Sequence, residues 1–289
     1  MGLYSWVKPK PMPEGKGVSK EKEAPIKVYF GVIQRKWGRM IALGATQFVA
    51  SLPVLAFAVF ALFGMYAFHT RPVDGAIVYG NMLQFMLICI PLIALISGPA
   101  TMGVTYVLRN YAREQHSWGF SDMLEKASKN YKQGFWVGLI NSVFVLFMVW
   151  MYYYYGSMNG EMKLTIVNYI ILVLMGLFLM MRSYLYPMAV SYQVSLKDLY
   201  RYSMALVFIK LPQNLLLQLA SAAVIALAFA IYPTIGIFLT AFGGMAFVGY
   251  THIFYIDRVL LQNMDEENEK DYELLKEKQK KTKKKGKKA

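Results

Sequence analysis

The sequence predicts an all-α, polytopic integral membrane protein with six transmembrane helices and two cytoplasmic amphipathic connecting helices. Hydrophobic residues make up 56% of the 289 residues, more than soluble chains usually carry. Charged residues make up only 17% and are gathered in a few stretches. The apolar segments between these stretches reach the length of about 20 residues that a helix needs to cross a bilayer.

Six uninterrupted apolar segments are expected to be the membrane spans. They are Met40 to Phe68, Met82 to Leu108, Gly134 to Tyr155, Leu164 to Tyr186, Gln213 to Ile231 and Pro233 to Ile256. The spans divide the chain into a basic N-terminal arm (1–39), a transmembrane domain (40–256) and a charged tail (257–289). The Lys-rich end of that tail is expected to be disordered, because it has no apolar surface to bury.

The distribution of basic residues predicts the orientation of the chain. Of the 31 Lys and Arg residues, 29 lie in or beside the segments on one side of the predicted spans, and 2 lie on the other side. Basic residues accumulate on the cytoplasmic side of membrane proteins. Both termini are therefore expected in the cytoplasm.

Two cytoplasmic segments are expected to form amphipathic helices, one from Asn110 to Gln133 and one from Ser195 to Lys210, with Ser195 as its N-cap. Their apolar faces would either lie in the lipid headgroups or dock a soluble partner. The candidate docking residues are Phe120, Met123, Leu124, Leu199, Tyr200 and Met204.

Small residues repeat every four positions on two of the predicted spans. Ala222, Ala226 and Ala230 do so on the fifth span, and Ala94 and Gly98 on the second. Because small side chains let helix backbones approach closely, both stripes are expected to be helix–helix contacts.

Few polar groups lie at bilayer depth. Gln84, Asn141, Asn168 and Arg182 are candidates either for lining a pore or for bonding between helices. For Arg182 three alternatives stay open: extension to the headgroups, an internal hydrogen-bonded anchor, or contact with a substrate.

The sequence shows no constellation typical of an enzyme or of a cofactor site. The single cysteine and the three scattered histidines exclude a Cys/His metal cluster, and no phosphate-binding glycine loop is present. We therefore expect no catalytic, cofactor-binding or metal-binding residues. The net charge of +14 comes largely from the N-terminal arm and the Lys tail, which points to anionic lipid headgroups and away from nucleic acid.

Several short motifs together resemble the YesL-like family of bacterial multi-pass membrane proteins. They are Gly17-Val18, Arg35-Lys36-Trp37, Ser51-Leu52-Pro53, Ser97-Gly98-Pro99-Ala100, Tyr106-Val107-Leu108-Arg109-Asn110, Phe120 and Asn130-Tyr131-Lys132-Gln133-Gly134. The resemblance covers about residues 15 to 260. It implies a protein of the bacterial inner membrane without enzymatic activity, linked to carbohydrate uptake. Gly98 and Pro99 match the family pattern, and their expected role is a helix distortion that lets another helix approach.

Two functions follow from these observations. The first is a non-enzymatic accessory or regulatory membrane protein that docks a transporter subunit or a sensor protein through its cytoplasmic helices. The alternative is a small permease subunit or channel that moves a solute itself. The sequence leaves the identity of the solute or partner, and the oligomeric state, open.

Overall fold

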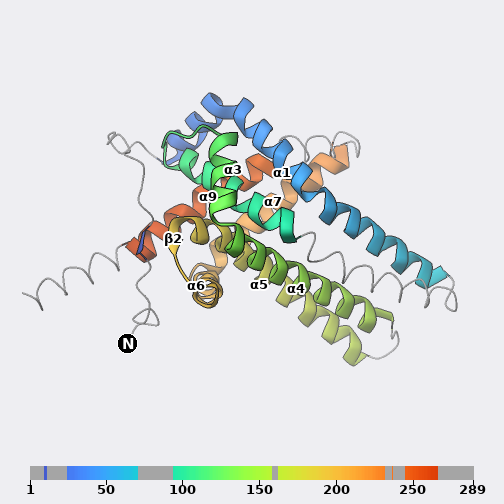
Figure 1. Ribbon diagram of the computed structural model, residues 1–289. Coiled ribbons are helices and arrows are strands. Elements are labelled where there is room, and N and C mark those ends of the chain that lie inside the picture. The colour runs from blue at the N-terminus through green and yellow to red at the C-terminus, as the bar shows by residue number, and fades with distance from the viewer. Residues whose placement is uncertain are drawn as a thin grey trace, which may run out of the picture.

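The computed structural model is helical (Figure 1). It describes residues 10–11, 25–70, 94–157, 162–231, 236 and 245–265. Within these ranges, the backbone alone is described for residues 10–11, 53–70, 149, 153–154, 156–157, 162–165, 231, 245 and 265. The strands in this part of the chain are two residues long: β1 (Lys10–Pro11) pairs antiparallel with β2 (Tyr192–Gln193). The predicted all-α fold class is therefore confirmed.

The helices follow the order that the sequence predicts. They are α1 (Pro25–Thr70), a helix described over 94–112, α3 (Phe120–Lys129), α4 (Tyr131–Ser157), α5 (Met162–Ser191), α6 (Leu196–Ile209), α7 (Leu211–Ile231), α9 (Met245–Leu260) and the π-helix η2 (Leu261–Asp265). The predicted amphipathic segment 110–133 is divided between three elements: the end of the 94–112 helix, α3 and the start of α4.

Three helices are long and apolar enough to cross a membrane. The qualifying segments are Tyr131–Tyr152 in α4, Ile166–Ser191 in α5 and Leu211–Ala230 in α7. They correspond to the third, fourth and fifth predicted spans. The other three predicted spans each include residues whose side chains lie outside the described part of the chain.

The helical domain extends past both predicted boundaries of the membrane domain. The first helix begins at Pro25, inside the predicted arm, and Val32 on it is only 1% exposed. At the other end α9 continues to Leu260, whose side chain is fully buried. Hydropathy identifies only the apolar part of a helix, and buried packing continues along the same helices outside that part. The boundaries at 39 and 257 stay predictions for the membrane domain, and the helices themselves continue across them.

α4 and α5 form an antiparallel hairpin and lie side by side along their length (Figure 1). The rings of Phe144 on α4 and Phe178 on α5 stack with their centroids 4.0 Å apart. In the same view α6 is seen nearly end-on while the hairpin crosses the picture, so α6 lies crosswise to the two long helices.

α9 connects the two clusters of buried residues in the molecule. Its Ile256 packs with α5 and α6, in a cluster that includes Leu185 and Leu206. Its Tyr250 packs with α1 and the 94–112 helix, in a cluster that includes Met40. The 94–112 helix contributes to both clusters, which makes it and α9 the centre of the described fold.

Glycines allow the 94–112 helix to touch α4 backbone to backbone. A Cβ added at Gly98 would overlap the carbonyl oxygen of Gly134, and one added at Gly138 would lie 3.1 Å from the Cα of Gly98 and 3.4 Å from the carbonyl oxygen of Ala94. The Cα of Pro99 lies at the same contact, 3.0 Å from a Cβ added at Gly134. The predicted contact at Ala94 and Gly98 is therefore present, as a helix approach of the kind expected for Gly98 and Pro99.

The second predicted stripe of small residues is not a contact. Ala222, Ala226 and Ala230 on α7 are all exposed. Where α7 approaches Gly236, it does so through Ala228 and Phe229. A small-residue repeat permits close packing, but it does not fix which face of a helix receives the neighbour, so this prediction was wrong.

Candidate functional site

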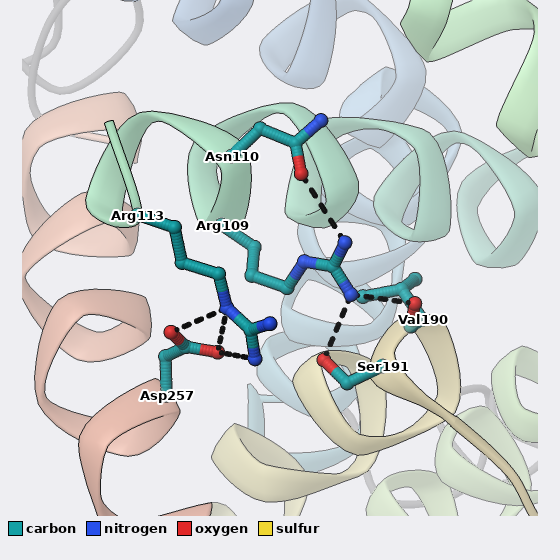
Figure 2. Close-up of polar contacts among 6 residues, drawn as sticks. All are labelled: Arg109, Asn110, Arg113, Val190, Ser191 and Asp257. Carbon is teal, nitrogen blue, oxygen red and sulfur yellow. Dashed lines mark hydrogen bonds and ion pairs between the residues drawn. The ribbon is translucent and has the colours of Figure 1, made fainter. Parts of the chain in front are cut away.

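The candidate site is the end of the bundle formed by residues 109–133 and 190–214, which we call the connector end. It holds α3, α6 and a cluster of charged side chains (Figure 2). Arg113 donates to Asp257 on α9 through Nε, at 2.8 Å from Oδ2, and through a terminal nitrogen, at 2.8 Å from Oδ1. Both side chains are buried, with 12% and 4% exposed. Such a two-point ion pair fixes geometry, and removing one partner would leave a buried charge.

Arg109 lies beside this pair and contacts the end of α5. Its guanidinium donates to the carbonyl oxygen of Val190 at 2.9 Å and to the Ser191 hydroxyl at 3.2 Å. It also donates to the side-chain oxygen of Asn110 at 3.2 Å. The last carbonyls of a helix lack backbone partners and carry partial negative charge, so a buried cation is well placed there.

The charged cluster therefore joins three helix ends. Arg113 ties the end of the 94–112 helix to α9, and Arg109 ties the same helix to α5 (Figure 2). These contacts hold the connector end together, which is a structural role. Within the described residues, no group of three or more His, Cys, Asp or Glu side chains could hold a metal ion.

α6 is fixed at both of its ends. The Ser195 hydroxyl accepts from the backbone N–H of Asp198, which confirms the predicted N-cap. At the other end the Asn214 amide donates to the carbonyl oxygens of Leu206 and Val207, at 3.4 and 3.3 Å. Asn214 in turn accepts from the Tyr184 hydroxyl of α5 at 2.6 Å. α6 is thus tied to α5 by packing and by hydrogen bonds.

α6 buries one face and exposes another. The buried residues on it are Leu199, Tyr202, Ser203, Leu206 and Val207. The exposed residues include Lys197, Arg201, Met204 and Phe208, with Met204 and Phe208 exposed by 37% and 59%. These four positions recur at helical spacing and form one stripe, which we call the α6 stripe. The stripe is basic at its N-terminal end and apolar at its C-terminal end.

α3 is held by a single buried residue and by backbone contact. Met123 is 3% exposed, and its carbonyl group lies so close to Gly103 that a Cβ there would overlap it. Phe120 and Leu124 lie to one side of this contact and are 57% and 51% exposed. On the opposite side Lys129 pairs with Glu125 at 2.5 Å, and both side chains are more than half exposed.

The six predicted docking residues fall into three groups. Met123 and Leu199 are buried and have no surface to offer a partner. Tyr200 is partly buried, and its hydroxyl donates to the side-chain oxygen of Asn141 at 3.1 Å. Burial raises the pKa of Tyr200, so it stays a neutral donor. Phe120, Leu124 and Met204 are exposed, as docking requires.

The predicted polar residues do not all gather around one point. Asn141 is buried on α4, Asn168 is partly buried on α5, and Arg182 is exposed on α5. Asn168 and Arg182 are separated by about 21 Å along α5 at the rise of a helix. Gln84 lies outside the described residues. Exposure of Arg182 argues against the internal anchor among its three alternatives.

A hollow in the described surface lies on α5 and is apolar. It is lined by Ile166, Tyr169, Ile170, Val173 and Leu174. Its lining contains none of the predicted polar residues. Its chemistry suits a lipid chain better than a polar solute.

The pair of Arg113 and Asp257 and the role of Asn214 were not predicted from the sequence. The partners of the ion pair are 144 residues apart, so nothing local connects them. The available signal was the position of Asp257 at the end of an apolar segment, because a charge there requires a partner. For Asn214 the signal was an amide just after Pro212, where the preceding helix ends.

Comparison with known proteins found no relative of this chain. No family model matches the chain, no curated protein matches it, and no solved structure matches it.

Proposed function

We propose that the chain is a non-enzymatic accessory protein of the bacterial inner membrane, with six spans and both termini in the cytoplasm, that docks a partner through the α6 stripe. The 29-to-2 division of basic residues supports the orientation. Three described helices of membrane-spanning length support the multi-span arrangement. The resemblance to YesL-like proteins supports a link to carbohydrate uptake.

The observation that carries this proposal is the unequal packing of the two faces of α6. One face is packed against α5, and the other presents Arg201, Met204 and Phe208 to the surroundings. Because α6 packs on α5 and is bonded to it through Asn214 and Tyr184, a partner that bound the stripe would act directly on α5, which is a membrane-spanning candidate. A rigid exposed helix face of this kind fits a groove on another protein.

The chemistry of the stripe defines the partner. Lys197 and Arg201 would pair with acidic side chains of the partner, while Met204 and Phe208 would pack against an apolar surface on it. The expected partner is a cytoplasmic domain, of a transporter subunit or a sensor, with an apolar groove and an acidic rim.

Site-specific photo-crosslinking in native membranes tests the proposal. A photoreactive phenylalanine analogue at Met204 is expected to capture a protein, and one at Val173, which is 63% exposed on α5, is expected to capture lipid. Arg201→Glu should abolish the Met204 adduct, whereas Lys132→Glu, a charge reversal at an exposed position on α4, should leave it. Lipid as the sole product at Met204 would refute docking by α6.

The rival function is transport by the chain itself. The observation in its favour is Asn141, which is 5% exposed and whose amide nitrogen has no hydrogen-bond partner within the described residues. Purified protein in vesicles should then pass a solute, and Asn141→Leu together with Arg182→Leu should stop the flux. Flux that these substitutions leave unchanged would remove this lining.

A further inference from the structure

The most exposed large hydrophobic side chain in the described residues belongs to a loop whose conformation is fixed. Trp118, between the 94–112 helix and α3, is 77% exposed. Exposing a ring of this size to water is unfavourable relative to burying it. A loop that only connects two helices has no need to expose such a ring, so the exposure of Trp118 requires an explanation.

Hydrogen bonds hold the loop in the shape that presents Trp118. The Asp122 carboxylate accepts from the Trp118 backbone N–H at 2.9 Å and from the Ser117 hydroxyl at 2.8 Å. The Ser117 hydroxyl oxygen accepts from the Gly119 N–H at 3.3 Å. Gly119 has a φ of 69°, a conformation that glycine adopts without strain. The tryptophan is thus preorganised outside the fold.

Apolar and aromatic side chains continue from Trp118 along one edge of α3. Phe120 and Leu124 are more than half exposed and lie one helical turn apart. On α1, Trp37 is 61% exposed. Tryptophan is enriched at the boundary between water and lipid, where its ring enters the headgroup layer and its N–H stays hydrated.

Basic residues of α1 lie next to this loop. Tyr111 connects the two, because its hydroxyl is 3.6 Å from a Cβ added at Gly119 and its ring lies under the Lys36 ammonium at 4.1 Å from the centroid. Burial and the nearby charges of Arg39 and Arg35 lower the pKa of Lys36. Arg35 and Arg39 are exposed beside Lys36 on α1, and Glu114, which pairs with Arg35, offsets only part of their positive charge.

We infer that the Trp118 loop, the Phe120–Leu124 edge of α3 and the basic residues Lys36 and Arg39 form an anchor in the headgroup layer of an anionic leaflet. The rings would enter the boundary of the acyl chains, and the cations would contact lipid phosphates. Each basic residue near such a surface contributes about 1 kcal/mol. The inference rests on the membrane placement in the proposed function and is independent of docking by α6.

Tryptophan fluorescence tests this anchor directly. The chain has five tryptophans, so Trp118 is isolated by replacing Trp6, Trp37, Trp136 and Trp150 with Phe. The full chain is reconstituted into vesicles of phosphatidylcholine, alone or mixed with phosphatidylglycerol. Trp118 is expected to emit at short wavelength, to be quenched by brominated lipid and to be protected from acrylamide, with stronger lipid quenching in the anionic vesicles.

A second variant that keeps only Trp150 is the control. Trp150 lies near the C-terminal end of α4, whereas the Trp118 loop precedes α3 at the other end of that helix. The lipid quenching of Trp150 should therefore not depend on phosphatidylglycerol. Lys36→Gln with Arg39→Gln, made in the Trp118-only variant, should weaken the response of Trp118 to anionic lipid. The expected loss is about 5-fold for each charge removed, the factor equivalent to about 1 kcal/mol.

Each remaining result overturns the inference. Quenching of Trp118 by acrylamide, with normal lipid quenching of Trp150, would place the loop in water. Protection of Trp118 from both quenchers would mean that protein covers it. Failure of lipid to quench Trp150 as well would instead refute the membrane placement that the proposed function assumes.

Discussion

α3 and α6 occupy equivalent places in the chain, each between two long helices, yet they are attached in different ways. α6 buries five residues and is bonded at both ends. α3 buries only Met123 and rests on the backbone at Gly103. Two similar amphipathic patterns have therefore produced one helix that belongs to the core and one that lies on its surface. The free energy of unfolding should therefore depend mainly on α6. Interactions at the surface should depend mainly on α3.

The largest difference is expected between matched truncations of the two helices. Leu206→Ala on α6 removes a side chain that is 1% exposed and should lower the free energy of unfolding by about 2–5 kcal/mol. Phe120→Ala on α3 removes a ring that only lipid would cover, and it should cost less than the lower end of that range. Thermal unfolding in nanodiscs measures both. Equal losses would show that α3 is as much a part of the core as α6.

Removal of the bonds at the end of α6 should have the next largest effect. Asn214→Leu leaves the carbonyls of Leu206 and Val207 and the hydroxyl of Tyr184 without this partner, at a cost of about 1–3 kcal/mol. The double variant with Tyr184→Phe should lose less than the sum of the single losses, because the two side chains share a bond. Strictly additive losses would show that the bond is not formed.

Local sequence patterns predicted features of single helices better than they predicted which residues meet in the tertiary fold. The N-cap at Ser195 and the contact at Ala94 and Gly98 follow from residue types and spacing along one helix. The list of docking residues was partly wrong, because amphipathicity identifies an apolar face without showing whether core, lipid or partner covers it. Met123 and Leu199 proved to be core residues for that reason. The pairing of Arg113 with Asp257 depends on the tertiary fold and has no local signature.

A substitution at Gly103 should move α3 without unfolding the rest. A methyl group there would overlap the Met123 carbonyl, and because α3 has few buried contacts to resist a shift, Gly103→Ala should cost about 1–3 kcal/mol by displacing α3. Hydrogen exchange of the amides of α3 should become faster while that of α6 is unchanged. Gly176→Ala is the control, since a Cβ at Gly176 meets nothing within 4 Å. Faster exchange in α6 as well would mean that the two connecting helices are coupled.

The smallest effect is expected for the ion pair on the outer side of α3. The hydrogen bond from Lys129, followed by its charge, lowers the pKa of Glu125 below the ordinary value of 4.5. A carboxyl whose pKa is lower in the folded state stabilises that state above 4.5, and the contribution is lost as the pH falls through the lowered value. Both side chains are more than half exposed, so water and salt screen the pair. Lys129→Gln should therefore leave the Tm at neutral pH almost unchanged and should slightly reduce its decline in acid. A decrease in Tm comparable to that of Leu206→Ala would show that the outer side of α3 carries tertiary structure, and the contrast between the two helices would fail.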